Sequence, residues 1–241
     1  MNIRRALGFL GEDPRASEKF GLGAIASLAP ILNLAAIGYQ VDVARCVARG
    51  EPKPMPEWNE LKRLWVQGAG LGLAYFVYSL PLLLLVFSGM ATVFVGLVLS
   101  VQSESARTGV GPPRPPALVV GIFLALLGAA FAYGLLFGFL RPAILAEYVQ
   151  RGTLQACFDF GAQWRFVRRD LGEYLRLWLT ELVVGWIISV PLFLMVFIVG
   201  LVPFVGPLLI TLVAAAAGFY LLLVSGHLVG QLLQARAHSL A

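Results

Sequence analysis

Long apolar segments alternate with short charged ones along this 241-residue chain. A helix needs about 20 apolar residues to cross the ~30 Å hydrocarbon core of a bilayer. The apolar segments cover residues 20–37, 66–101, 117–140, 177–199 and 208–233. The pattern predicts an all-α fold, a polytopic integral membrane helical bundle with five apolar segments.

Two of these segments leave alternatives open. Residues 20–37 are short for a span and contain Pro30 and Asn33, so they either cross the bilayer or dip in and return. Residues 66–101 are too long for one untilted span and rather short for two. A hairpin at Ser88-Gly89 would divide them and give six spans instead of five.

The composition supports a membrane protein. The chain is 59% apolar and 13% charged, against about 25% charged residues in soluble domains, and its mean hydropathy is +0.83. Glu181 is the one acid in the long apolar segments, which contain no Lys or Arg. The net charge of +5 indicates attraction to anionic lipid rather than to nucleic acid.

Part of the sequence occurs twice, which predicts an internal repeat. Pro81 and Pro191 also occupy matching places in two apolar segments. We expect a single membrane domain over residues 1–241, with repeat one at about 20–101 and repeat two at about 118–233. We interpret an aqueous loop at 102–116 as an insertion at a turn that has no such loop in the second repeat. The recurring residues are Ala44, Val47, Arg49 and Gly50, and then Ala146, Val149, Arg151 and Gly152.

The distribution of positive charge predicts the orientation. Residues 45–63 hold five Lys or Arg and residues 141–176 hold six, against two in 102–116 and none in 201–207. Two spans separate the two basic segments, so both lie on the same side of the membrane. The positive-inside rule places them and the C-terminus in the cytoplasm. We therefore expect a multi-pass protein of a prokaryotic cytoplasmic membrane.

Basic and aromatic residues interleave in both basic segments, as is typical of the membrane–water boundary. The spacing of Trp58, Leu61 and Trp65 predicts a surface helix over residues 57–65, and a second short helix over residues 3–10 ends at Asp13-Pro14. We expect the two basic segments to form cytoplasmic interfacial amphipathic helices that bind lipid. The candidate lipid-binding residues are Arg45, Arg49, Lys53, Trp58, Trp65, Trp164, Arg165, Arg168 and Arg169.

Few residues suggest other chemistry. Glu181 within a span is either a proton, cation or substrate site or a boundary carboxylate paired with Arg176 or Arg141. His227 lies in the last span, where a packing role is favoured over a ligand role. Two histidines and the scattered Cys46 and Cys157 do not make a metal site. We find no nucleophile–base pair or phosphate-binding loop, and so expect no enzyme and no cofactor.

Short motifs of glycine, proline, aromatic and charged residues occur in both halves of the chain. Those in the first half are Asp13-Pro14, Lys19, Gly38-Tyr39, Arg45, Arg49-Gly50-Glu51, Pro54, Pro56-Glu57-Trp58 and Gly68. Those in the second half are Pro142-Ala143, Ala146, Gly152, Phe158-Asp159-Phe160, Tyr174 and Gly226-His227-Leu228. These motifs resemble a family of prokaryotic polytopic membrane proteins, the domain of unknown function 4013. The resemblance implies a compact membrane domain and carries no assigned reaction.

Two functions remain open at this point. The first is a non-enzymatic membrane module that engages membrane lipid, a partner protein or a second copy of itself through the basic aromatic segments. The alternative is a small-molecule or ion transporter with a site near Glu181 and the helices that contain Pro81 and Pro191.

Overall fold

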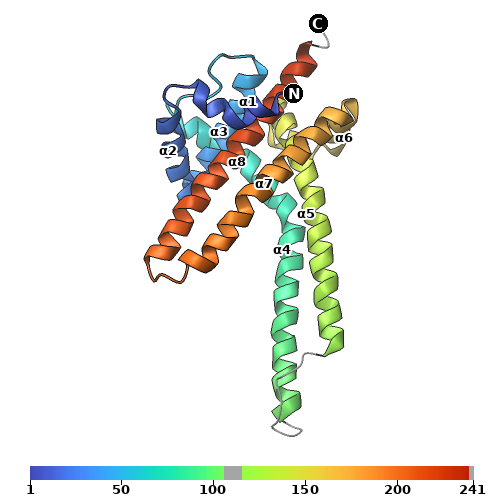
Figure 1. Cartoon of the computed structure of the whole chain (residues 1–241). Helices are drawn as coiled ribbons and strands as arrows, with labels where there is room; N and C mark the ends of the chain where they lie inside the picture. The colour runs from blue at the N-terminus through green and yellow to red at the C-terminus, as the bar shows by residue number, and fades with distance from the viewer. Residues whose placement is uncertain (106–115, 239–241) are drawn as a thin grey trace. The chain divides into compact units, whose positions relative to one another are not determined.

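The computed structural model describes residues 1–105 and 116–238, and these residues form a helical protein (Figure 1). Five of the helices in these ranges, α3, α4, α5, α7 and α8, are long and apolar enough to cross a membrane. The predicted all-α bundle with five apolar segments is therefore confirmed. The elements are α1 (Ile3–Gly8), η1 (Phe9–Glu12), α2 (Ala16–Leu28), α3 (Pro30–Ala48), α4 (Leu61–Ser105), α5 (Ala117–Arg151), η2 (Leu154–Phe158), α6 (Phe160–Arg169), α7 (Leu171–Val199) and α8 (Val205–His238).

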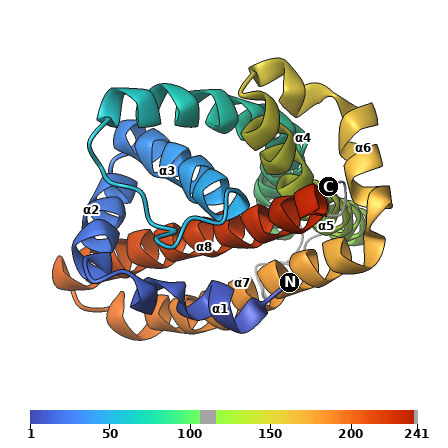
Figure 2. The same ribbon diagram turned by 90° about the horizontal axis from the view of Figure 1, so that it is seen from above.

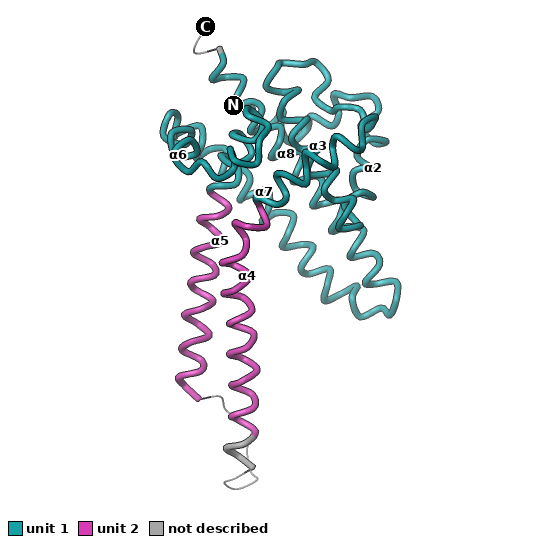
Figure 3. The backbone as a smooth tube through the Cα atoms, turned by 180° about the vertical axis from the view of Figure 1, so that it is seen from behind, with its two compact units in different colours: residues 1–74, 140–241 teal, residues 75–139 magenta. Residues whose placement is uncertain are grey.

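The chain divides into two compact units, residues 1–74 with 140–241 and residues 75–139 (Figure 3). The second unit is a pair of helices taken from α4 and α5. Within it, the Tyr133 hydroxyl donates to the Tyr78 carbonyl at 2.7 Å, and the Tyr78 and Phe137 rings stack with centroids 6.1 Å apart. Most of its other large side chains are exposed and apolar, as suits a surface that faces lipid.

The first unit is organised around α3 and α8. Helix α3 lies along α8, α2 packs on both of them, and α7 packs antiparallel to α8 (Figure 2). Helix α3 is the most buried of the five membrane-length helices. The start of α4 crosses α3 at very short range, because glycines stand at the contact. A Cβ on Gly68 would lie 1.6 Å from the Leu34 carbonyl oxygen, and one on Gly38 would lie 1.9 Å from that of Leu64.

The first apolar segment is not one helix. The structure divides residues 20–37 at Ala29, where α2 ends and Pro30 begins α3. Proline suits the first turn of a helix, where its missing N–H leaves no hydrogen bond unmade. The membrane-length helix at this end of the chain is therefore residues 30–48, which continue past Ile37 into the first basic segment.

The predicted surface helix over residues 57–65 is wrong. Residues 57–60 are not helical, and Leu61 begins α4. The Trp58 ring stacks on Tyr39 with centroids 4.4 Å apart, and its Nε1 donates to the Lys19 carbonyl at 3.1 Å. Trp58 thus packs into a protein core that includes Tyr39 and Phe219, whereas Trp65 is exposed. The two tryptophans do not share a face.

The long second segment is a single helix. Helix α4 runs through Pro81 and through Ser88-Gly89, so the hairpin that would give six spans is wrong. It also continues to Ser105, which shortens the predicted loop at 102–116. Residues 106–115 of that loop lie outside the described residues. Helix α5 likewise continues beyond the predicted span at 117–140, through Pro142 to Arg151.

A buried ion pair fixes the N-terminal segment to the chain between α3 and α4. Lys19 Nζ lies 2.7 Å from Asp13 Oδ2, and both side chains are at most 5% exposed. The same ammonium group donates to the Met55 carbonyl at 2.8 Å. Burial alone would raise the pKa of Asp13, but hydrogen bonds from Lys19 and the Arg15 N–H hold that pKa below its usual value. Burial opposes the charge of Lys19 in the same way, yet its bonds to Asp13 and Glu57 raise the pKa of the lysine.

Candidate functional site

The ends of α3, α5 and α8 and one face of α6 line an open cavity of about 900 Å³, here called the arginine cavity. Six arginines and one acid, Glu147, line it. Glu147 is buried and lies 3.1 Å from Arg151. The excess of guanidinium groups suits an anionic ligand, since arginine binds phosphate or carboxylate through paired N–H groups. The arginines are Arg45, Arg49, Arg151, Arg165, Arg169 and Arg236.

Helix α6 positions two of these arginines. Its first turn is capped by Asp159, whose carboxylate accepts from the Ala162 N–H at 2.8 Å and from Arg151 Nη1 at 2.9 Å. These two hydrogen bonds lower the pKa of Asp159, because both favour its charged form. Phe166 and Val167 on the inner face are buried, and this burial fixes the rotation of the helix.

The end of α8 is attached to the same helix. Arg236 Nη2 donates to the Phe166 carbonyl at 2.8 Å, and its guanidinium lies 3.8 Å from the Phe166 ring centroid. Such a contact combines a charged hydrogen bond with a cation–π interaction. It holds the cavity wall formed by α8 against the wall formed by α6.

The arginines of the cavity differ in how far other side chains neutralise them. Arg49 lies 2.8 Å from Glu51, and Arg151 binds Glu147 and Asp159. Arg165 and Arg169 are exposed, and within the described residues they make no hydrogen bond or ion pair. These two are therefore the cavity arginines that no ion pair or hydrogen bond holds in place.

The structure brings together four of the predicted lipid-binding residues, Arg45, Arg49, Arg165 and Arg169. The others lie elsewhere. Trp58 is in the core of the first unit, and Lys53 and Trp65 are exposed away from the cavity lining. Trp164 and Arg168 are on the outer face of α6, where the guanidinium lies 4.9 Å from the tryptophan ring centroid.

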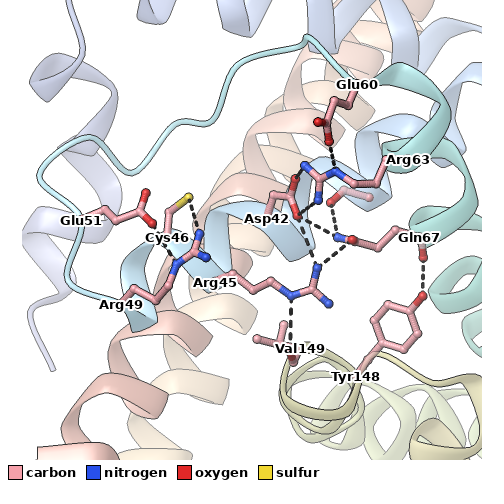
Figure 4. A network of polar contacts seen from close by, with 11 residues as sticks. Asp42, Arg45, Cys46, Arg49, Glu51, Glu60, Arg63, Gln67, Tyr148 and Val149 are labelled. Carbon is pink, nitrogen blue, oxygen red and sulfur yellow. Dashed lines mark hydrogen bonds and ion pairs between the residues drawn. The ribbon is translucent and has the colours of Figure 1, made fainter.

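Arg45 also belongs to a polar network around Asp42 (Figure 4). Asp42 is 5% exposed, and its two oxygens accept from Arg63 at 2.6 and 3.2 Å. Gln67 Nε2 donates to the same carboxylate at 3.0 Å, while its Oε1 accepts from Arg45 Nη1 at 2.7 Å. Arg45 Nε donates to the Val149 carbonyl at 3.4 Å. The network therefore joins α3, α4 and α5, and it commits the Asp42 carboxylate to structure rather than to chemistry.

Replacing Asp42 with Asn should destabilise the protein by about 1.5–3 kcal/mol, the range for hydrogen bonds to charged groups. The substitution keeps the size of the side chain but removes the charge that holds Arg63 and Arg45. The midpoint of thermal unfolding in detergent measures the effect. Glu60→Gln is the matched control, because Glu60 is an exposed partner of the same Arg63 and exposed pairs contribute about 0–1 kcal/mol. Equal midpoints for the two variants would contradict this role of Asp42.

Glu181 and His227 lie apart from the arginine cavity. Glu181 faces a depression of about 360 Å³ on α7 that Gly185 and Ser189 also line, and its buried Oε1 has no hydrogen-bond partner. The transport hypothesis for this residue stays a prediction. His227 is 1% exposed, and its ring lies 4.6 Å from the Phe9 ring, as expected for a packing role. Among the described residues, no His, Cys, Asp and Glu side chains are grouped so as to hold a metal ion.

Sequence reasoning missed several residues of the arginine cavity and of the polar network around Asp42, namely Asp42, Gln67, Glu147, Arg151 and Arg236. One signal was available. Arg151 is the repeat equivalent of Arg49, a predicted lipid-binding residue, so the repeat itself pointed to it. Asp42 and Gln67 gave no such signal, because their pairing depends on how α3 and α4 cross.

Five membrane-length helices and a cavity lined by arginine define a polytopic helical membrane protein. The family described as Protein of unknown function (DUF4013) matches residues 22–197, well over half of the chain, and the chain belongs to this family. The resemblance noted from its short motifs is thereby confirmed. No curated protein and no solved structure matches the chain.

Proposed function

We infer that this protein is a non-enzymatic membrane module that binds the head groups of anionic lipids in the arginine cavity. The observation that carries the proposal is the juxtaposition of six arginines around one cavity of about 900 Å³ with a single acid among them. Two of those arginines, Arg165 and Arg169, are exposed and form no ion pair or hydrogen bond within the described residues.

Lipid is the favoured source of the anion for two reasons. The first is that the cavity belongs to a chain whose five longest helices are of membrane length. The second is the outer face of α6, where Phe160 is 61% exposed and Trp164 is 49% exposed beside Arg168. Exposed aromatic rings next to cations are typical of a helix at the membrane interface. In such a helix the inner face presents Arg165 and Arg169 to a head group.

The proposed duplication accounts for part of the cavity. Gly50 and Gly152 follow Arg49 and Arg151 at equivalent positions of the two halves, and both have positive φ angles, +70° and +67°. Glycine adopts this left-handed conformation without steric cost and ends a helix there. The same local turn thus occurs after α3 and after α5, and the arginine before each turn lines the cavity. This agreement supports an internal repeat.

Neutralising Arg165 and Arg169 together to Gln should weaken binding of phosphatidylglycerol by about thirtyfold, from ~1 kcal/mol for each cation near an anionic lipid. Neither side chain has a structural partner within the described residues, so the fold should be retained. Native mass spectrometry of the detergent-solubilised protein, titrated with phosphatidylglycerol and with phosphatidylcholine, measures the bound lipid. The wild-type chain should retain phosphatidylglycerol in preference to phosphatidylcholine.

The control variant replaces Arg4 and Lys53 with Gln. It removes the same charge from two exposed positions outside the cavity lining. Its preference for phosphatidylglycerol should be unchanged. Equal losses in the two double variants would show that general positive charge, not the cavity, attracts the lipid. An undiminished preference after the loss of Arg165 and Arg169 would overturn the proposal.

A further inference from the structure

The connection between α7 and α8 is unlike an aqueous loop. Residues 190–210 form a run without a single polar side chain. At its centre the chain turns between Gly200 and Val205, and the side chains there point outward. Leu201 is 82% exposed and Phe204 is 92% exposed, with Val202 and Val205 also exposed. The connection between α4 and α5, in contrast, includes Arg107 and Arg114 in its sequence.

The backbone of this turn needs few hydrogen bonds from water. The N–H groups of Gly200, Val202, Val205, Gly206 and Leu208 donate to carbonyls inside the turn or the adjoining helix ends, at 2.7–3.5 Å. Pro203 and Pro207 have no N–H to satisfy. The N–H groups of Leu201 and Phe204 donate to no carbonyl in this set of hydrogen bonds. Backbone in the hydrocarbon region must satisfy its polar groups internally, and this turn does so for most of its N–H groups.

Phe204 has a φ of +62°, a left-handed conformation that usually belongs to glycine or asparagine. An apolar aromatic ring is thus held in a strained backbone position and exposed at the tip of the hairpin. In water this arrangement would combine strain with the exposure of a large apolar ring. Among acyl chains the ring is solvated.

We propose that the tip of the α7–α8 hairpin, residues 200–205, lies within the bilayer among lipid acyl chains and does not emerge into water on the far side. The apolar part of α7, residues 177–199, rises about 34 Å, at 1.5 Å per residue, against a hydrocarbon core of ~30 Å. A tilt of about 30°, within the range of roughly 0–40° found for spanning helices, brings this rise within the thickness of the core. The proposal is independent of the arginine cavity.

Site-directed spin labelling tests the location of the tip. The protein carries Phe204→Cys in a chain whose buried Cys46 and Cys157 are replaced by alanine, and it is reconstituted in vesicles of phosphatidylglycerol and phosphatidylcholine. Collisions with oxygen report acyl chains, and collisions with a polar nickel complex report water. Phe193→Cys, an exposed position within α7, is the lipid reference. Lys53→Cys, outside the membrane-length helices, is the aqueous reference.

The label at position 204 should match the one at 193, with high oxygen access and nickel access about tenfold below that at 53, since water is excluded from the hydrocarbon region. Nickel access equal to that at 53 would place the tip in water and overturn the proposal. Low access to both reagents would show that protein covers the tip, and would overturn it equally. Leu201→Cys repeats the measurement at an exposed tip position whose backbone is not strained, in case Phe204→Cys does not fold.

Discussion

Gly68→Ala should destabilise the protein by about 3 kcal/mol or more, at the upper end of the range for overpacking. The added methyl group would lie 1.6 Å from the Leu34 carbonyl oxygen, and its nearest neighbours are backbone atoms of α3. Backbone cannot rotate away as a side chain can, so α3 and α4 would have to separate. Their separation would also stretch the contacts of Asp42 with Arg63 and Gln67. Thermal unfolding in detergent and the yield of monodisperse protein measure the effect.

Gly128→Ala provides the matched control for this prediction. Gly128 also lies within a long apolar helix, α5, but a Cβ there would meet nothing within 4 Å. Alanine is favoured over glycine in a helix interior by roughly 0.5–1 kcal/mol, so this variant should be unchanged or more stable. Gly38→Ala should behave like Gly68→Ala, because its methyl group would meet the Leu64 backbone. Equal stability of the variants at 68 and 128 would contradict the close helix crossing.

Lys19→Met should lower the free energy of unfolding by about 3–5 kcal/mol, the range for breaking a buried ion pair. It leaves Asp13 charged and 5% exposed, and it removes the bond that ties α2 to the Met55 carbonyl. The double variant Asp13→Asn with Lys19→Met leaves no buried charge and should recover part of the loss. A double variant that is no more stable than Lys19→Met alone would contradict this account of the pair.

The same pair predicts how stability depends on pH. The pKa of Asp13 lies below its usual 3.8, so its contribution is present above about pH 4 and is lost as pH falls through the lowered pKa. The pKa of Lys19 lies above its usual 10.5, so its contribution is present below that pH and is lost as pH rises through the raised pKa. Wild-type stability relative to the double variant should therefore be constant between these limits. A difference that changes near pH 7 would contradict the assignment.

The sequence was sufficient to predict that the protein lies in a membrane and that its fold is helical. Both predictions follow from the lengths of the apolar runs and the segregation of charge. It failed where an amphipathic pattern has two physical meanings. The spacing of Trp58, Leu61 and Trp65 suits a helix on a membrane surface, but Trp58 instead stacks on Tyr39. The same residue types serve a lipid boundary and a protein core, and local spacing does not distinguish the two.

Only part of the candidate site was predictable from the sequence. Clusters of basic residues pointed to Arg45, Arg49, Arg165 and Arg169, but nothing local indicated that they share one cavity. That fact depends on the packing of α3, α5, α6 and α8, whose cavity-lining residues are up to about 190 positions apart in the sequence. The hydrogen-bond partners of Asp42 could not be predicted for the same reason, because Arg63 and Gln67 contact it only where α3 and α4 cross.

The two glycine turns, at Gly50 and Gly152, bear on the origin of the molecule. On the proposed duplication, the ancestral half would have ended its first helix with the same Arg-Gly turn. It would have formed one wall of the arginine cavity but not the opposite wall. A half-length ancestor could then have surrounded an anion only as a pair of chains, and fusion of the two genes would have made that pairing permanent.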